Sequence, residues 1–267
     1  GILMYAEVKT VTRLSPNMMR IVFDGGDLES FENTPYTDQY INAYFVPENA
    51  PYTVPFDLEE ARSLGDAFRP RPRRFTVRKW DQSSKQLTVD FVVHGDQGYA
   101  GTWAQKATAG DRLQFKGPNG SYSPNNEVDW HLLAGDESAL SAICASLESI
   151  SDSQPCKIFV VIDGRENEIP VVLPPLHDMV WVHRSQSADP ENALLAAIQK
   201  HNFRDGSYDV FIHGEAGEVR EIRKYLILEH GIDIKSASIS PYWKRDHTDE
   251  AWRSVKKQWL ADQEKDT

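Results

Sequence analysis

The chain has 267 residues, of which 40% are hydrophobic and 26% charged, and its formal net charge is -11. This length is enough for about two domains, each with a core of its own, and the composition is ordinary for a globular protein. The acidic balance excludes a general affinity for nucleic acid or an anionic membrane surface, so an anionic ligand would need a local basic patch.

The first half of the sequence predicts short β-strands. β-Branched and aromatic residues alternate with polar ones over 5–14, 19–23, 40–46, 74–79, 86–94 and 112–116. Such strands with turn signals between them predict an antiparallel barrel or sandwich. The segment 47–72 is rich in proline and charge and predicts a long loop.

The second half changes to strands that alternate with helices. Strands are predicted over 130–134, 157–162, 178–183 and 208–213, and helices over 139–150, 192–201 and 218–229. This alternation predicts a parallel α/β sheet. We therefore expect two domains, residues 1–124 and 128–267.

A last helix is predicted over 246–262, with Asp246 or Thr248 as its N-cap. Trp252, Val255 and Trp259 would share one apolar face that packs onto the second domain.

The sequence shows no pattern typical of a membrane span, a secretory signal or a metal site. No segment reaches the roughly 18 apolar residues of a membrane span, and no secretory signal is visible at the N-terminus. The chain has two cysteines, Cys144 and Cys156, too few for an iron–sulfur cluster, and its eight histidines show no zinc spacing. We expect a cytoplasmic protein with free thiols and no bound metal.

The run from Arg71 to Arg78 is the densest basic feature. Arginine binds phosphate oxygens through a rigid fork, and Phe75 falls on the same face of a strand as Arg73. With the hydroxyl of Thr76, the strand could hold a diphosphate, stack on a flat ring and bond to its edge, as a flavin dinucleotide requires. The alternative is a basic edge strand that discourages pairing.

Two later segments could also contact a ligand. Three glycines, Gly95, Gly98 and Gly101, follow a predicted strand and allow close backbone approach. Thr102 could cap a helical turn there whose amides face a phosphate, although a ligand-free loop explains the pattern equally well. The strand–Gly–Asp–Glu–Ser–helix unit at 130–150 is a weaker nucleotide signal, because Asp136 and Glu137 would repel a pyrophosphate.

These segments occur in an order that resembles the siderophore-interacting proteins, a branch of the ferredoxin–NADP reductase-like flavoproteins. The resemblance rests on six blocks, which are Arg73–Arg78, His94–Ala104, Gly117–Gly120, Ala134–Leu140, Gly214–Ala216 and Tyr242–Arg245. It implies an N-terminal antiparallel flavin-binding β-barrel, followed by a C-terminal parallel α/β nicotinamide-binding domain with a C-terminal helix. It also implies bound FAD and reduction of ferric siderophores by NADH or NADPH.

The resemblance assigns roles to individual residues. Arg73 would hold the FAD phosphates, Phe75 would stack on the flavin, and Thr76 would reach the reactive ring edge as the catalytic residue. The other expected dinucleotide contacts are Val77, Arg78, His94, Gly98, Ala100, Gly101, Thr102 and Trp103. Asp136, Glu137 and Glu215 would lie where the nicotinamide enters.

This sequence departs from the family pattern at four positions. Phe75 replaces a usual tyrosine, Tyr99 and Ser141 stand where proline is common, and Asp246 stands where glycine is common.

The resemblance leaves the substrate and the electron donor open. Four cations could attract an anionic ferric siderophore, or could be solvated surface charge, namely Arg69, Arg71, Lys244 and Arg245. The 2′-phosphate of NADPH would be disfavoured by three acidic residues, Asp163, Glu166 and Glu168, and favoured by Arg165. We therefore expect NADH as the donor, with a ferredoxin as a further candidate.

We expect a monomer. Two rival functions are a siderophore carrier without reductase activity and a flavin reductase with another acceptor.

Overall fold

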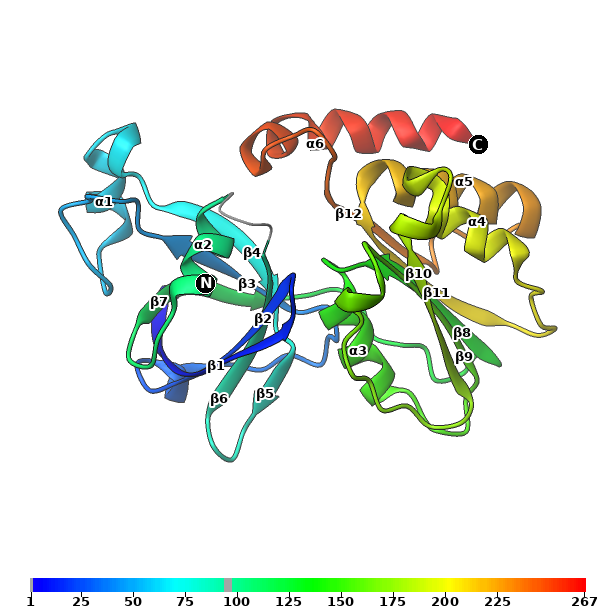
Figure 1. Ribbon diagram of the computed structural model, residues 1–267, viewed down its shortest axis with the longest axis horizontal. Helices are drawn as coiled ribbons and strands as arrows, with labels where there is room; N and C mark the ends of the chain where they lie inside the picture. Colours follow the sequence, from blue (N-terminus) through cyan, green and yellow to red (C-terminus); the bar gives the residue numbers. More distant parts are fainter. Residues whose placement is uncertain (1, 94–97) are drawn as a thin grey trace. The chain divides into compact units, whose positions relative to one another are not determined.

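The computed structural model describes residues 2–93 and 98–267 (Figure 1). The chain divides into two compact units, Gly1–Ser123 and Pro124–Thr267, and each contains one β-sheet. Across the described residues, no helix has the length and apolar character needed to cross a bilayer.

The first unit is built on an antiparallel seven-stranded sheet with the order β4-β3-β7-β1-β2-β6-β5. Its strands are β1 (Met4–Ser15), β2 (Met18–Asp24), β3 (Tyr40–Phe45), β4 (Arg71–Thr76), β5 (Lys79–Asp81), β6 (Gln86–Val92) and β7 (Arg112–Asn119). The prediction of an antiparallel β-rich N-terminal half is confirmed.

The two ends of this strand order are consecutive in the chain. The N–H of Val77 donates to the Gln39 carbonyl (2.8 Å), beside β3, and the N–H of Arg78 donates to the Thr88 carbonyl (2.9 Å), on β6. One short segment therefore bonds to both sides of the sheet and closes it into a barrel. The prediction of one strand over 74–79 was wrong, because the chain changes partner strand at Val77 and Arg78.

Alternating residues of these strands fill the interior of the first unit. Phe23, Ile41, Leu87, Phe91 and Phe115 are each at most 1% exposed. The helix α2 (Tyr99–Lys106) covers part of this core with Trp103, whose ring centroid lies 5.8 Å from that of Phe45.

The predicted loop over 47–72 contains local structure. The helix α1 (Leu58–Ser63) begins after Asp57, whose side chain accepts a hydrogen bond from the Glu60 N–H. The buried Gln114 of β7 accepts from the Phe56 N–H (2.9 Å) and donates to the Phe56 carbonyl (2.7 Å). This segment is therefore a loop that contains one short helix and is tied to the barrel, and β4 begins at Arg71, inside the predicted loop.

The second unit is built on a parallel five-stranded sheet with the order β10-β9-β8-β11-β12. Its strands are β8 (Trp130–Asp136), β9 (Cys156–Ile162), β10 (His177–His183), β11 (Tyr208–Glu215) and β12 (Ser238–Trp243), and its helices are α3 (Leu140–Ser149), α4 (Ala193–Lys200), α5 (Ala216–His230) and α6 (Asp249–Gln263). The predicted α/β alternation is confirmed, while β12 was not predicted. Further 3-10 turns cover 28–30, 66–68, 165–167, 184–186, 190–192 and 264–266.

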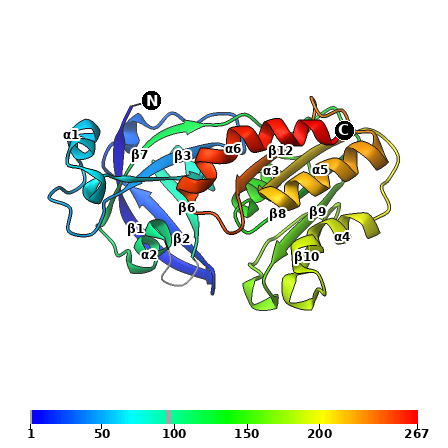
Figure 2. The same ribbon diagram turned by 90° about the horizontal axis from the view of Figure 1, so that it is seen from above.

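Helices cover both faces of this sheet (Figure 2). Leu132 and Ala134 of β8 pack with Leu194 of α4 and Ile222 of α5 in one core. Gly135 points to the other face, where an added Cβ would lie 2.7 Å from the Cβ of Ala139, at the start of α3. Glycine at this position lets α3 approach the sheet closely.

The C-terminal helix α6 lies along α5 (Figure 1). Thr248 is its N-cap, accepting from the Ala251 N–H, so Thr248 and not Asp246 fills that role. Arg220 of α5 makes two hydrogen bonds of 2.7 and 2.8 Å to the carboxylate of Asp266. The predicted packing is confirmed for Trp252, which is 2% exposed, but Val255 is 40% exposed and does not belong to the buried face.

Candidate functional site

The arginine strand β4 faces the start of α2 in the first unit. Arg71, Arg73 and Phe75 share one face of β4 by the alternation of side chains along a strand. The guanidinium carbons of Arg71 and Arg73 lie 5.4 and 6.0 Å from the ring centroid of Tyr99, the first residue of α2. Two segments that the sequence suggested separately are thus side by side.

Phe75 lies between this surface and the barrel core. Its ring centroid is 4.6 Å from that of Phe91 and 6.0 Å from that of Phe45. The side chain is half-buried, so the remaining ring surface is open to a ligand. Trp103 also packs into this aromatic group, 6.0 Å from Phe91, and is only partly buried, so its contact with the cofactor stays a prediction.

The first turn of α2 presents backbone N–H groups without a capping side chain. Gly98 is the N-cap, with a φ of +82° that favours glycine. A Cβ added there would meet no described atom within 4 Å, so the choice of glycine follows from this backbone conformation and not from crowding. Arg73 and this helix start together supply the donors that a diphosphate needs.

Thr102 does not cap this helix, contrary to the prediction. The helix already begins at Tyr99, so Thr102 lies in its second turn. Gly101 is buried and Ala100 packs against the barrel core, which leaves Gly98 as the exposed member of the predicted loop contacts. His94 lies outside the described residues.

The residues that follow Phe75 differ from one another. Thr76 is the last residue of β4 and is partly exposed, so its side chain lies where the regular alternation of the strand ends. Val77 is 2% exposed and its N–H is bonded to Gln39, so the predicted contact of Val77 with the cofactor would have to come from its carbonyl group. Arg78 is half-buried, and its N–H is bonded to Thr88 across the barrel closure.

The two other arginines of the substrate prediction lie just before and at the start of β4. Arg69 pairs with the carboxylate of Asp66 (3.6 Å), and Arg71 donates to the Asp66 carbonyl (3.0 Å). The Asp66 carboxylate offsets part of the charge of Arg69, whereas the Asp66 carbonyl, being neutral, does not offset the charge of Arg71.

The second unit gathers charged residues at the carboxyl ends of its parallel strands. Asp136 ends β8 and is 1% exposed. One carboxylate oxygen accepts from the Ser138 N–H (2.9 Å) and hydroxyl, and the other accepts from the Glu215 N–H (2.9 Å) and the Trp243 indole (2.8 Å). Because both oxygens accept hydrogen bonds, Asp136 holds three strand ends together, and its predicted position near the nicotinamide entry stays a prediction.

Glu137 pairs with an arginine that the sequence analysis did not single out. Arg184 follows β10 and donates to both Glu137 carboxylate oxygens (3.0 and 3.1 Å), and also to Asp163 after β9 (3.0 Å). Burial raises the pKa of Glu137, with the charge of Asp136 adding to this and Arg184 opposing it. Arg184 and its two carboxylate partners, Glu137 and Asp163, therefore link the loops after β8, β9 and β10.

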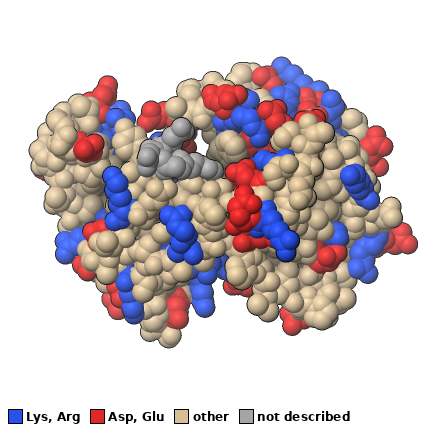
Figure 3. All heavy atoms as spheres, in the orientation of Figure 1, with Lys and Arg blue, Asp and Glu red and all other residues tan. Residues whose placement is uncertain are grey.

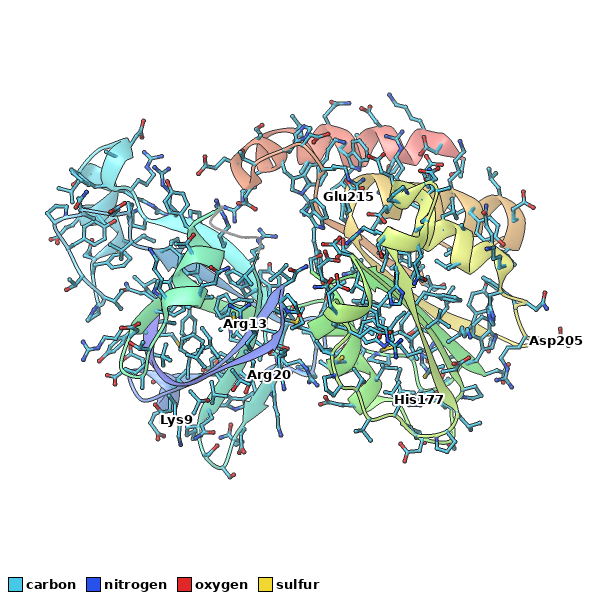
Figure 4. The ribbon with its side chains drawn as sticks, in the orientation of Figure 1. Lys9, Arg13, Arg20, His177, Asp205 and Glu215 are labelled. Atoms are coloured by element: carbon cyan, nitrogen blue, oxygen red, sulfur yellow. The ribbon has the colours of Figure 1, made fainter. Side chains whose placement is uncertain are left out.

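A second carboxylate–arginine group follows β11. Glu215, which Figure 4 labels at the end of β11, is the N-cap of α5, accepting from the Glu218 N–H (2.9 Å). Its other oxygen accepts from the Arg245 N–H (2.9 Å), so Glu215 is also a structural residue. Arg245 lies near Glu218 (3.3 Å) and Glu191 (3.8 Å), which offsets its charge.

Glu218 is the most perturbed acid of this group. It is 5% exposed, and its Oε1 is buried without a hydrogen-bond partner. Burial, with the charge of Asp136 adding to it, raises the pKa of Glu218 to about 8. Sequence spacing alone could not have found this residue, since it depends on which strand ends are neighbours.

Lys244 also has a partner, since its Nζ lies 4.6 Å from the ring centroid of Trp259 on α6. Trp259, Arg245 and Glu218 line a cavity of about 430 Å³ along α5. Acidic and basic side chains are interspersed over the face drawn in Figure 3. Among the described residues, no group of three His, Cys, Asp or Glu side chains could hold a metal ion.

Comparison with known proteins identifies the family of both units. Residues 7–122 match the siderophore-interacting FAD-binding domain, and residues 128–246 match the siderophore-interacting protein family. An uncharacterised protein of Mycobacterium tuberculosis is 38% identical, covering 98% of this chain and 96% of that protein.

Named reductases are also similar to the chain. The ferric vibriobactin reductase of Vibrio cholerae is 32% identical, covering 90% of this chain and 88% of that protein. The NADPH-dependent ferric-chelate reductase of Escherichia coli is 27% identical, covering 88% and 91%. The crystal structure of a siderophore-interacting protein from Aeromonas hydrophila has the same fold, with a TM-score of 0.82 over 97% of this chain and 98% of that one, at 22% identity.

Proposed function

The chain belongs to the siderophore-interacting protein family, and we propose that it is an FAD-dependent ferric-siderophore reductase supplied with electrons by NADH or NADPH. The observation that carries this proposal is the surface formed by Arg71, Arg73 and the uncapped start of α2. It joins two diphosphate-binding elements beside a half-buried aromatic ring, that of Phe75.

Each residue of this surface would have a distinct task. Arg73 and the first N–H groups of α2 would neutralise the diphosphate, since a guanidinium and a helix N-terminus both favour negative charge. The open ring surface of Phe75 would hold the flavin in place, and the Thr76 hydroxyl would bond to its edge. When bound, FAD accepts an electron pair from a reduced nicotinamide and passes single electrons to Fe(III).

The second unit would receive the nicotinamide dinucleotide. Ligands of open α/β sheets bind at the carboxyl ends of the strands where the strand order reverses, which here is between β8 and β11. Asp136 would act there only by fixing the strand ends. Glu137 and Asp163 already occupy the guanidinium of Arg184, which supports NADH over NADPH, with a ferredoxin as the other candidate donor.

The ferric siderophore would be attracted by positive charge. Arg69 and Arg71 are the stronger candidates, because the charge of Arg245 is offset by three carboxylates, those of Glu191, Glu215 and Glu218. Lys244 retains its charge while stacked on Trp259 and could contribute.

The first test of this function is spectroscopic. The purified protein should show a flavin spectrum, alone or after incubation with FAD, and NADH or NADPH should bleach it without oxygen. Adding a ferric siderophore to the reduced protein should produce Fe(II) faster than free reduced flavin does. A colourless protein that cannot take up FAD would contradict both reductase functions and leave a siderophore carrier, whereas bleaching without Fe(II) formation would favour another acceptor.

A matched pair of variants tests the site. Arg73→Ala should lose FAD and remain folded, because it removes the phosphate-facing guanidinium. Arg74→Ala is the control, since Arg74 lies on the other face of β4, is exposed, and has its guanidinium 5.1 Å from the Tyr40 ring centroid. Stoichiometric FAD in purified Arg73→Ala, or equal loss in both variants, would refute the assigned role.

A further inference from the structure

Tyr99 occupies an unusual place in the first unit. It is the first residue of α2 and is 41% exposed, yet its ring is near two guanidinium groups, those of Arg71 (5.4 Å) and Arg73 (6.0 Å). An arginine within about 6 Å of an aromatic ring centroid is attracted to the ring. The ring is therefore attracted to both arginines on the ligand-facing side of β4.

The helix itself does not require this ring. The first position of a helix tolerates most residues, proline included. The core is filled by Trp103, four residues later on the same side of α2. The Tyr99 hydroxyl makes no hydrogen bond to the described part of the chain. What remains for the ring to do is contact Arg71 and Arg73.

We propose that Tyr99 is a positioning residue, whose ring holds the guanidinium groups of Arg71 and Arg73 beside the start of α2 in readiness for the diphosphate of FAD. This inference rests on the proposed function. An arginine side chain has many rotamers, and ordering them on binding lowers affinity. Tyr99 would order the pair before the ligand arrives.

Three substitutions separate the ring from the other properties of this residue. Tyr99→Phe keeps the ring and removes only the hydroxyl. Tyr99→Pro removes the aromatic ring but suits the first helical position. Tyr99→Leu removes aromaticity and keeps an apolar side chain. Each is compared with the wild type by thermal unfolding, and two ring-deficient variants of different backbone preference guard against a folding defect in one of them.

The measurement is the Kd of the apoprotein for FAD, from quenching of flavin fluorescence at several salt concentrations. Tyr99→Phe should bind within twofold of the wild type. Tyr99→Leu and Tyr99→Pro should bind about fivefold to tenfold more weakly, about 1.0–1.4 kcal/mol. Their salt dependence should match the wild type, because both guanidinium charges remain, whereas Arg73→Ala should flatten it.

Each alternative result has one meaning. Wild-type affinity in both ring-deficient variants would overturn the positioning role and leave FAD binding intact. Equal weakening in Tyr99→Phe would assign the effect to the hydroxyl and also overturn it. A wild-type protein that does not bind FAD at all would overturn the proposed function together with this inference, and that outcome is recognised before any variant is measured.

Discussion

Replacing Asp136 with alanine tests whether one buried carboxylate organises the strand ends of the second unit. The substitution removes the acceptor for the N–H groups of Ser138 and Glu215 and for the indole of Trp243. These donors belong to the segments after β8, at the end of β11 and at the end of β12. They would lose their partner together.

The expected loss of stability follows from the number of hydrogen-bond donors left without an acceptor. A buried donor left without a partner costs about 1–3 kcal/mol, and the three N–H groups together would cost about 3–9 kcal/mol. The Ser138 hydroxyl, which also donates to Asp136, can rotate toward another acceptor. The variant also no longer buries a charged carboxylate, which is costly to desolvate, and this offsets part of the loss of stability. We therefore expect Asp136→Ala to lower the free energy of unfolding by about 3 kcal/mol, and Asp136→Asn, which keeps one acceptor oxygen, by about 2 kcal/mol.

Urea unfolding of the full chain, followed by tryptophan fluorescence, measures this loss. Trp130, Trp181, Trp243, Trp252 and Trp259 belong to the second unit, so they dominate the signal from the chain's seven tryptophans. Ser138→Ala is the control, because it removes only one hydroxyl donor and should cost about 1 kcal/mol or less. A loss below about 1 kcal/mol for Asp136→Ala would refute the organising role.

Three further predictions concern titration and reactivity. Burial, with the charge of Lys256, lowers the pKa of His213 to about 3. The free energy that neutral His213 contributes to stability is therefore present above pH 6.5 and falls by about 1.4 kcal/mol per pH unit toward pH 3. Urea unfolding of His213→Gln should show a smaller dependence of stability on pH over this range. Burial raises the pKa of Glu218 to about 8, so stability should fall as pH rises from about 4.5 to 8, and Glu218→Gln should remove that fall. Burial raises the pKa of Cys156 to about 12, so its thiol should resist alkylation by iodoacetamide in the folded protein and react in urea.

Much of the fold was predictable because its signals are local. Alternation in the first half and strand–helix alternation in the second identified both sheets. β12 was missed for a physical reason, since it contains Pro241 and two serines, Ser238 and Ser240. A proline cannot donate to a sheet, and it is tolerated here because β12 is the edge strand. α1 was missed because its six residues are too few for a clear helical period.

The site was predictable only in part. Arg73 and Phe75 were placed together because strand geometry alone determines which residues share a face. The roles of Asp136 and Glu215 were not predictable, since their carboxylates bond to residues on other strands, and strand order is not written in local sequence. Arg184 was missed for the same reason, because its two carboxylate partners follow different strands.

The junction at Val77 and Arg78 restricts where this chain can gain or lose residues. The Val77 N–H bonds beside β3 and the Arg78 N–H bonds to β6, which closes the sheet into a barrel. One residue added or removed between Arg73 and Arg78 would therefore break this closure or move the arginine side chains to the other face of β4. The exposed ends of the segment 46–70 are less restricted than this junction, because longer loops cost little to close, although Phe56 is bonded to Gln114 of the barrel. Members of this family should therefore vary in length before Arg71 and keep a constant length from Arg71 to Arg78.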